Sequence, residues 1–300
     1  MAKKTTSPSS VFLKDKVVTN DQVRLKTYST RIAPGKTTLV FVNSLAMPFD
    51  MAEHFLLKLR MEDEYNIVTY TSRGVPRSIK AKQIAVGIDQ HVNDLSAVIE
   101  HYELKNKKVV LMGWYTGCNI SIEYALRFPE HVKQLVCING FFSVLSPELY
   151  TPYEKSMIKY CTGIYKSLDI AMAYQQSFFS EAQFRALSQK LGTLNPNFIT
   201  PSYTPFSSGM NFYLYANALH SIVNNSLDRW EYKIKLSNIP VLIIASTEDK
   251  TSSYCSSELL YHLIKNESTQ FYSVQGGDHY SPFDTKFSKS VVSGIHSFIH

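Results

Sequence analysis

Short apolar runs alternate with longer stretches of helical periodicity along most of the chain. Residues 21–32 alternate between apolar and polar side chains, which is typical of a strand in a half-exposed antiparallel pair. Five later runs are continuously apolar, as in parallel strands buried on both faces: TTLVFVN, YNIVTYT, KVVLMG, KQLVCIN and PVLIIAS. Helical periodicity marks residues 49–62, 83–104, 118–128 and 253–265. The pattern predicts an α/β fold in which helices cover both faces of a twisted, mostly parallel sheet.

One long segment interrupts this alternation. Residues 141–232 are rich in aromatic side chains and largely helical in pattern, with the Pro-, Asn- and Ser-rich middle LNPNFITPSYTPFSSG. An insertion between strands predicts a helical lid over the strand ends, where open α/β sheets bind ligands. We expect most of its Tyr, Phe and Met side chains to form the lid's own core and the others to line an apolar pocket. The predicted organisation is a flexible tail (1–14), an α/β core (15–140 and 233–300) and the lid (141–232).

Composition and charge narrow the class of protein. The 300 residues are 44% hydrophobic and 19% charged, which is typical of a globular chain. No run approaches the roughly 18–20 apolar residues of a membrane span, and no apolar leader follows MAKKTTSPSS, so we expect no membrane span and a cytoplasmic location. The net charge of +6 comes without a Lys/Arg cluster, which argues against nucleic acid as a partner. The four cysteines show no short paired spacing and are expected to be reduced thiols.

The segment GWYTG, residues 113–117, lies between a predicted buried strand and a predicted helix. Gly113 and Gly117 would let the strand and the helix approach closely around a residue with a strained backbone. Such an elbow projects its central side chain above the sheet. That residue is usually a nucleophile, whereas here it is Tyr115, preceded by Trp114. The spacing of two glycines is weak evidence by itself.

Two further segments supply partners for this elbow. Asp249 follows a predicted buried strand in IIASTEDKTS, where a carboxylate can orient an imidazole. His279 lies in SVQGGDHYSPFD, between the last predicted strand and the last helix. The order of elbow, acid and histidine is that of α/β hydrolases. Glu248 and Asp278 are alternative carboxylates. Roles as a turn cap for Asp249 and as a loop or core residue for His279 stay open.

Residues from about 15 to 300 resemble the α/β-hydrolase fold superfamily, in particular its lactone hydrolases, haloperoxidase-like esterases and acyl-transferring thioesterases. FVNSLAMPFDM is similar to the loop after the third strand, YTSRGVPRS to the Arg-Gly segment, and LMGWYTGCNISIEYALRFPEHVKQLVCING to the elbow with its helix and following strand. The resemblance implies that the backbone N–H groups of Leu45 and Thr116 form an oxyanion hole. Candidate pocket residues in the first of these loops are Asn43, Ser44 and Met47.

The sequence departs from the family pattern at several positions. Tyr115 stands where the family has Ser, Cys or Asp. Asn43 and Ser44 replace the usual His-Gly pair, and so do Val75 and Pro76 in the Arg-Gly segment. An oxyanion hole built from main-chain groups could persist without the serine.

Three hypotheses of function follow. In the first, Tyr115 is a covalent nucleophile, although its phenol has a pKa of about 10 and extends beyond the position of a serine oxygen. Thr116 and Cys118 are poor substitutes because an elbow exposes only its central residue.

In the second hypothesis, His279 and Asp249 carry out acid–base chemistry on a carbonyl or acyl compound while Tyr115 donates a hydrogen bond or fills the pocket. Isomerisation, elimination, cyclisation and water-assisted cleavage belong to this class. In the third, the chain binds an apolar ligand or partner without turnover. The retained acid and histidine favour the second.

No metal and no cofactor are expected from the sequence. It contains no phosphate-binding loop or dinucleotide fingerprint. The other histidines show no metal-ligand spacing with Cys, Asp or Glu: His54, His91, His101, His131, His220, His262, His296 and His300. We expect an apolar or acyl small molecule as substrate. An acyl carrier protein, which is acidic as a class, would suit the positive net charge.

Overall fold

The computed structural model describes residues 11–47, 49–74, 85–177, 186, 189–190, 208–225 and 238–300, without the side chains of residues 50, 51, 54 and 175–177. One eight-stranded sheet runs through the molecule in the order β1-β2-β4-β3-β5-β6-β7-β8. The first two strands are antiparallel to their neighbours and the other six are mutually parallel. The strands are β1 (Leu13–Val18), β2 (Arg24–Ser29), β3 (Thr38–Val42), β4 (Asn66–Tyr70), β5 (Val109–Trp114), β6 (Val132–Ile138), β7 (Val241–Ser246) and β8 (Thr269–Val274).

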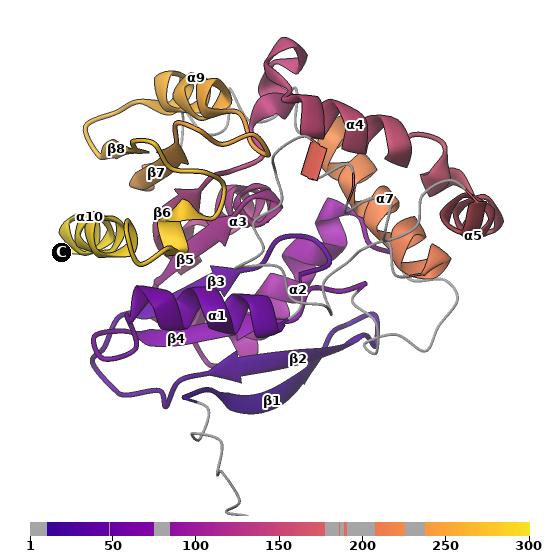
Figure 1. Ribbon diagram of the computed structural model, residues 1–300. Coiled ribbons are helices and arrows are strands. Elements are labelled where there is room, and N and C mark those ends of the chain that lie inside the picture. The colour runs from indigo at the N-terminus through magenta and orange to yellow at the C-terminus, as the bar shows by residue number, and fades with distance from the viewer. Residues whose placement is uncertain are drawn as a thin grey trace, which may run out of the picture.

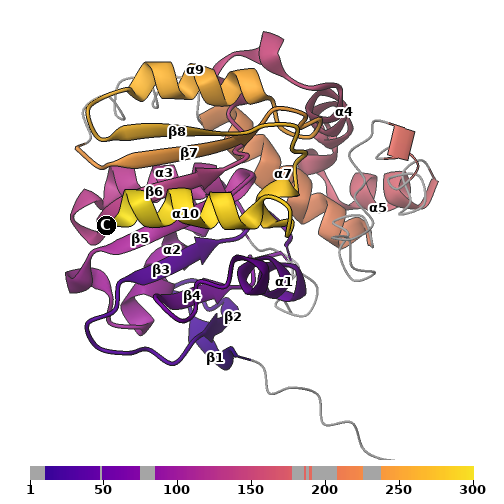
Figure 2. The ribbon, with the colours of Figure 1, turned by 60° about the vertical axis from the view of Figure 1, so that its left-hand side comes forward.

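Helices cover both faces of the sheet (Figure 1). On one face α1 and α10 pack against each other, and on the other α2 packs against α3 (Figure 2). These helices and the one beside β7 and β8 are α1 (Phe49–Leu59), α2 (Ile88–His101), α3 (Thr116–Arg127), α9 (Tyr254–Ile264) and α10 (Ser288–Ile299). The fold class predicted from the sequence is therefore confirmed. No helix among the described residues is long and apolar enough to cross a membrane.

The described part of the inserted segment is helical. It contains α4 (Pro152–Cys161), α5 (Leu168–Ser177) and α7 (Gly209–Asn225), and the latter two pack against each other (Figure 1). Ile88 N–H donates to Ser221 Oγ at 3.0 Å, which ties α7 to the start of α2. Within 141–232, residues 178–185, 187–188, 191–207 and 226–232 lie outside the described residues, as do Val75 and Pro76.

The ends of several elements differ from the sequence predictions. The expected tail (1–14) overlaps the sheet, because Leu13 already pairs with Ser29 and the Phe12 ring packs edge-on against Phe49. Helix α1 ends at Leu59, since Arg60 takes a left-handed φ of 51°. The helix expected at 118–128 begins two residues earlier, directly after the elbow.

Strand register brings the candidate chemistry to one edge of the sheet. Val42 of β3 pairs with Gly113 of β5, which pairs with Cys137 of β6, and Cys137 pairs with Ile243 of β7. The residues that follow these strands therefore meet at the carboxyl edge, which is where parallel sheets bind ligands.

Candidate active site

The elbow after β5 holds Tyr115 in a strained backbone conformation. Its φ of 51° and ψ of −118° are unusual for a residue with a side chain. A Cβ added to Gly117 would lie 2.1 Å from the carbonyl oxygen of Val42, and one added to Gly113 would lie 2.7 Å from the backbone of Cys118. Both glycines are thus required by the close approach of α3 to β3 and β5.

Asp249 and His279 are brought together at the carboxyl edge. His279 Nδ1 lies 2.7 Å from Asp249 Oδ2, and the two side chains are 4% and 2% exposed. The backbone N–H groups of Thr251 and Ser252 donate to the other carboxylate oxygen, at 2.7 and 2.8 Å. Because each carboxylate oxygen has a partner, the orientation of Asp249 is fixed, and the imidazole follows it.

Tyr115 lies against this pair. Its ring is 5.2 Å from the His279 ring in an edge-to-face arrangement and 5.5 Å from the Phe141 ring. Burial raises the pKa of the Tyr115 phenol well above its ordinary value, and the nearby Glu154 carboxylate raises it further. The ring of Trp114, the residue before Tyr115, also lies 4.8 Å from the His279 ring. The phenol therefore keeps its proton in the folded protein.

The backbone donors implied by the family resemblance are only partly open. Leu45 N–H donates to Thr116 Oγ1 at 2.9 Å, and Ser44 Oγ lies 2.9 Å from the same oxygen. The short threonine hydroxyl thus reaches back to the loop and gives the Leu45 N–H, one of the two expected oxyanion-hole donors, an acceptor within the protein. The Thr116 N–H stands at the start of α3, where helices leave N–H groups unpaired.

The side chains of Asn43, Ser44 and Met47, the pocket candidates in the loop after β3, hold that loop in its conformation. The Asn43 amide donates to the carbonyl oxygen of Tyr70 at the end of β4. Ser44 belongs to the hydroxyl cluster just described, and its carbonyl accepts from Met47 N–H at 3.1 Å. Met47 is fully buried. Packing and loop closure therefore account for these side chains.

The thiol of Cys118 lies behind the elbow. It is buried and points toward the carbonyl oxygen of Ile138, with a sulfur-to-oxygen distance of 3.6 Å. Burial raises the pKa of this thiol well above its usual range. Both features disfavour Cys118 as a substitute nucleophile.

The Arg-Gly segment supports the structure around it. Arg73 is fully buried and forms a two-pronged interaction with Asp94 of α2, at 2.7 and 2.5 Å. A third contact, of 2.8 Å, joins the guanidinium to Asp21. These bonds hold the loop after β4 against α2 and the loop before β2.

Glu154 is a site residue that the sequence reasoning missed. It lies in the first turn of α4 and forms a capping box with Thr151, whose N–H donates to Glu154 Oε2 at 2.8 Å. The same oxygen also accepts from Ser143 Oγ at 2.9 Å. Its Oε1 is buried and has no hydrogen-bond partner among the residues that the structure describes. Burial raises the pKa of this carboxyl to about 8, and the charge of Asp249 adds to the effect.

Hydrogen bonds connect α4 to the loop that holds Asp249. The Thr151 hydroxyl donates to the carbonyl oxygen of Thr251 at 3.1 Å, while Thr251 N–H donates to Asp249. The sequence contains a signal for the helix start, since Thr151 and Glu154 have the spacing of a capping box. The sequence contains no signal that the Glu154 carboxyl is buried beside the elbow.

Asn139 is a second residue that the sequence reasoning missed. It follows β6 with a left-handed φ of 44°. Its amide nitrogen donates to the carbonyl oxygen of His279 at 2.9 Å, and its amide oxygen accepts from Ser246 N–H at 2.9 Å. This side chain fixes the histidine loop against the end of β7.

A group of possible metal ligands lies at the other edge of the sheet. Glu64, His296 and His300 each present one ligand atom, and these atoms lie within 4.8 Å of one another. The signal in the sequence is the His-x-x-x-His spacing on the last helix, but the carboxylate comes from a distant segment before β4.

Comparisons with known proteins agree with this architecture. A family model described as the alpha/beta hydrolase fold matches residues 37–285. Among solved structures, the chain is similar to an enol-lactonase from Burkholderia xenovorans LB400 (12% identity, 95% of this chain and 99% of that one, TM-score 0.69). It is also similar to a thermophilic esterase from Thermogutta terrifontis, with 15% identity over 96% of this chain and 98% of that one and a TM-score of 0.66. A third similar structure is the esterase RhEst1 from Rhodococcus sp. ECU1013, with 17% identity over 95% of this chain and 98% of that one and a TM-score of 0.66.

Proposed function

The chain belongs to the alpha/beta hydrolase fold family, and on that premise we propose that it is an enzyme that acts on a carbonyl or acyl compound by proton transfer through His279. Asp249 orients the imidazole, and no serine nucleophile takes part. The substrate class comprises esters, thioesters, lactones and related biosynthetic intermediates. The reaction is an isomerisation, elimination, cyclisation or water-assisted cleavage.

The observation that carries this proposal is the buried contact of 2.7 Å between His279 Nδ1 and Asp249 Oδ2 beside the elbow. A carboxylate at Nδ1 favours the tautomer with its proton there, which leaves the lone pair on Nε2 available as a base. A histidine that served packing alone would not need a carboxylate clamped by two backbone N–H groups.

The state of Tyr115 supports proton transfer over covalent catalysis. A nucleophilic phenolate would have to form where burial and the Glu154 carboxylate both raise the pKa of the phenol. A neutral phenol instead serves as a hydrogen-bond donor or as a wall of the pocket next to His279.

Glu154 provides the complementary acid in this proposal. With a pKa raised to about 8, the carboxyl is mainly protonated at neutral pH and can donate a proton or a hydrogen bond. In this proposal the Glu154 carboxyl acts as the acid and the His279 imidazole, oriented by Asp249, acts as the base.

The test is turnover of a panel of p-nitrophenyl esters, acyl thioesters and lactones, with product analysis by mass spectrometry. We expect activity in the wild type and Tyr115→Phe, and a loss of about 10²–10⁴-fold in His279→Ala. His262→Ala is the matched control, since that exposed histidine lies on α9 away from the carboxyl edge. An equal loss in Tyr115→Phe and His279→Ala, with an acyl adduct on Tyr115, would replace this mechanism by a covalent one.

A non-catalytic binding module is the second candidate, and the Leu45 N–H favours it because Thr116 already occupies this donor. It predicts saturable ligand binding without turnover by the wild type. Gain of ester hydrolysis only in Tyr115→Ser would agree with this candidate and count against native acyl hydrolysis.

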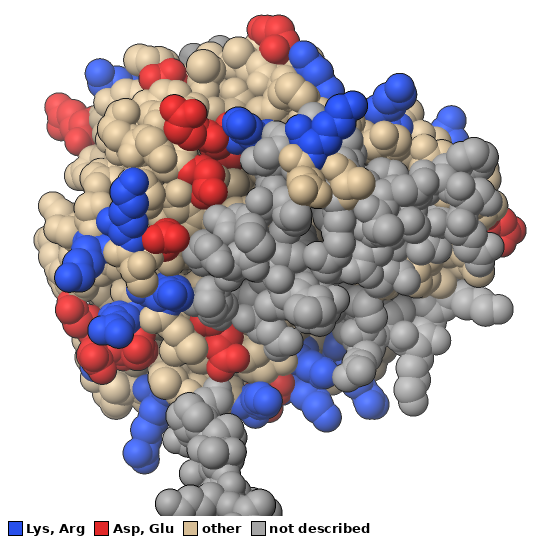
Figure 3. Space-filling model, in the orientation of Figure 1, with Lys and Arg blue, Asp and Glu red and all other residues tan. Residues whose placement is uncertain are grey.

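An acyl carrier protein is the proposed source of a carrier-bound substrate. Lys and Arg side chains gather over α4 in Figure 3, and Lys155, Lys159 and Lys166 of this region are exposed. Such a surface attracts an acidic partner. Affinity for a carrier protein should fall as salt is added; an affinity independent of salt would remove this partner from the proposal.

A further inference from the structure

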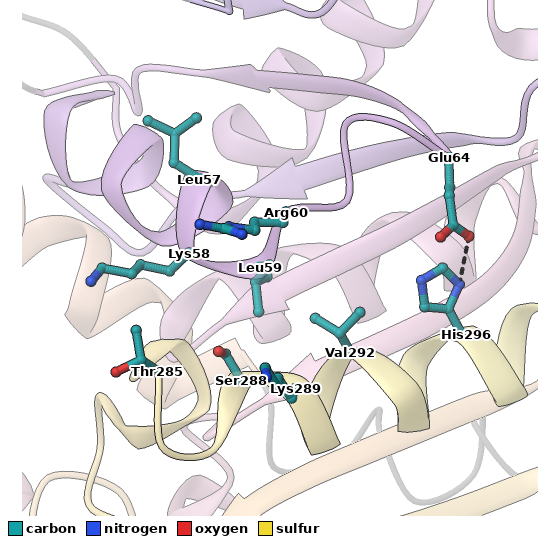
Figure 4. Close-up of a pocket in the computed structure, with 10 residues that line it drawn as sticks. All are labelled: Leu57, Lys58, Leu59, Arg60, Glu64, Thr285, Ser288, Lys289, Val292 and His296. Atoms are coloured by element: carbon teal, nitrogen blue, oxygen red, sulfur yellow. Dashed lines mark ion pairs between the residues drawn. The ribbon is translucent and has the colours of Figure 1, made fainter.

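A compact group of nitrogen and oxygen atoms lies where the loop before β4 meets the end of α10. His296 Nδ1 is 3.1 Å from Glu64 Oε2 and 2.9 Å from Tyr65 Oη. Tyr65 Oη is also 3.2 Å from His300 Nε2. Figure 4 shows Glu64 and His296 facing each other at one end of a surface groove, with Lys58 at the other end.

These separations are close to those of a tetrahedral metal centre. Zinc bonds to nitrogen and oxygen are about 2.0–2.2 Å, which places neighbouring ligand atoms about 3.3–3.6 Å apart. Glu64 Oε2 and His296 Nδ1 are 3.1 Å apart, and Tyr65 Oη lies 2.9 and 3.2 Å from the two imidazoles. The ligand atoms of Glu64, His296 and His300 all lie within 4.8 Å of one another, so modest movements of the side chains would bring them to tetrahedral spacing. Two imidazoles and a carboxylate are a donor set that zinc accepts.

The local structure prepares the two imidazoles. His296 and His300 are four residues apart at the end of α10, so their side chains project from one face of the helix. Their rings are nearly parallel, with an interplanar angle of 12° and centroids 6.2 Å apart. The hydroxyl of Tyr65 contacts a nitrogen of each ring.

Solvent reaches the group without any opening of the core. The side chain of Glu64 is 59% exposed and that of His296 is 25% exposed. The adjoining groove has a volume of about 650 Å³. Arg60 and Lys289 also line this groove, so we expect a lower affinity than that of closed zinc centres.

We propose that Glu64, His296 and His300 bind one divalent cation of the zinc type, with the oxygen of Tyr65 as a weaker fourth donor. The bound ion would join the loop before β4 to the end of the chain. The site lies at the amino edge of β4, away from His279, so it does not depend on the proposed acid–base chemistry.

The test uses full-length protein freed of metal by a chelator and titrated with Zn²⁺ at neutral pH by calorimetry. We expect one ion per chain with a micromolar dissociation constant, and a rise in melting temperature on the order of 3–5 °C at a hundredfold excess of Zn²⁺ over that constant. Cobalt(II) should give the strong visible absorption of a tetrahedral complex.

Variants separate this site from adventitious binding. His296→Ala and His300→Ala should each weaken Zn²⁺ binding at least tenfold, and Tyr65→Phe should weaken it less. His300 follows the last helical residue and is exposed, so its removal leaves the fold intact. His262→Ala is the control and should bind as the wild type does. A stoichiometry above one, or an equal loss in the control, would overturn the proposal, as would an affinity unchanged by His300→Ala.

Discussion

The buried carboxyl of Glu154 should make the stability of the protein fall as pH rises. Its pKa is raised from 4.5 to about 8, chiefly by burial. The folded protein therefore holds a proton that the unfolded chain releases above pH 4.5. This contribution is complete below pH 4.5 and is lost progressively as pH rises toward 8. At about 1.36 kcal/mol per pKa unit, the whole shift corresponds to about 5 kcal/mol, and relaxation around the charge reduces the measured effect to about 2–5 kcal/mol.

The substitution Glu154→Gln isolates the pH-dependent contribution of this carboxyl to the free energy of unfolding. The amide is neutral at every pH, and its oxygen can still accept from Thr151 and Ser143. We expect the variant to match the wild type near pH 5 and to exceed its free energy of unfolding by about 2–5 kcal/mol at pH 9. Urea unfolding at three pH values, followed by circular dichroism, measures the difference. The control is Glu267→Gln, because Glu267 is an exposed glutamate. A difference between Glu154→Gln and the wild type that is the same at pH 5 and pH 9 would refute the reasoning.

Three further predictions concern packing around the site, each measured by chemical unfolding. Gly117→Ala should cost about 3 kcal/mol or more, since its Cβ would meet the Val42 carbonyl at 2.1 Å; a cost below 1 kcal/mol would contradict the close approach. Arg73→Lys should cost about 3–5 kcal/mol because a lysine cannot make the two-pronged contact, and a neutral result would show that the pair is dispensable. Thr116→Val should cost about 1–3 kcal/mol by leaving Leu45 N–H without its acceptor, whereas Thr116→Ser should be milder.

The parallel strands could be predicted from the sequence because their apolar runs record burial on both faces. β1 could not, since most of its residues are exposed and pairing with β2 stabilises it. Its sequence, LKDKVV, therefore carries no core-facing pattern of the kind that marks β5.

Some features of the candidate site could likewise be predicted from the sequence, and others could not. The loop positions of Asp249 and His279 follow from strand ends, so their proximity could be predicted from chain order. The contact between Leu45 N–H and Thr116 Oγ1 could not, because it depends on the rotamer of one threonine between two loops. The burial of Glu154 depends in turn on where α4 docks, which no local pattern records.

The hydrogen bond from Thr151 to the Thr251 carbonyl also has a kinetic consequence. Any excursion of the start of α4 away from the sheet must break it, and with it the support of the backbone turn that clamps Asp249. The amide protons of Thr251 and Ser252, which donate to Asp249, are therefore expected to exchange faster with deuterium when the first turn of α4 departs. The same local fluctuation would govern both the exchange lifetime of these two protons and the fraction of time for which the imidazole loses its orientation.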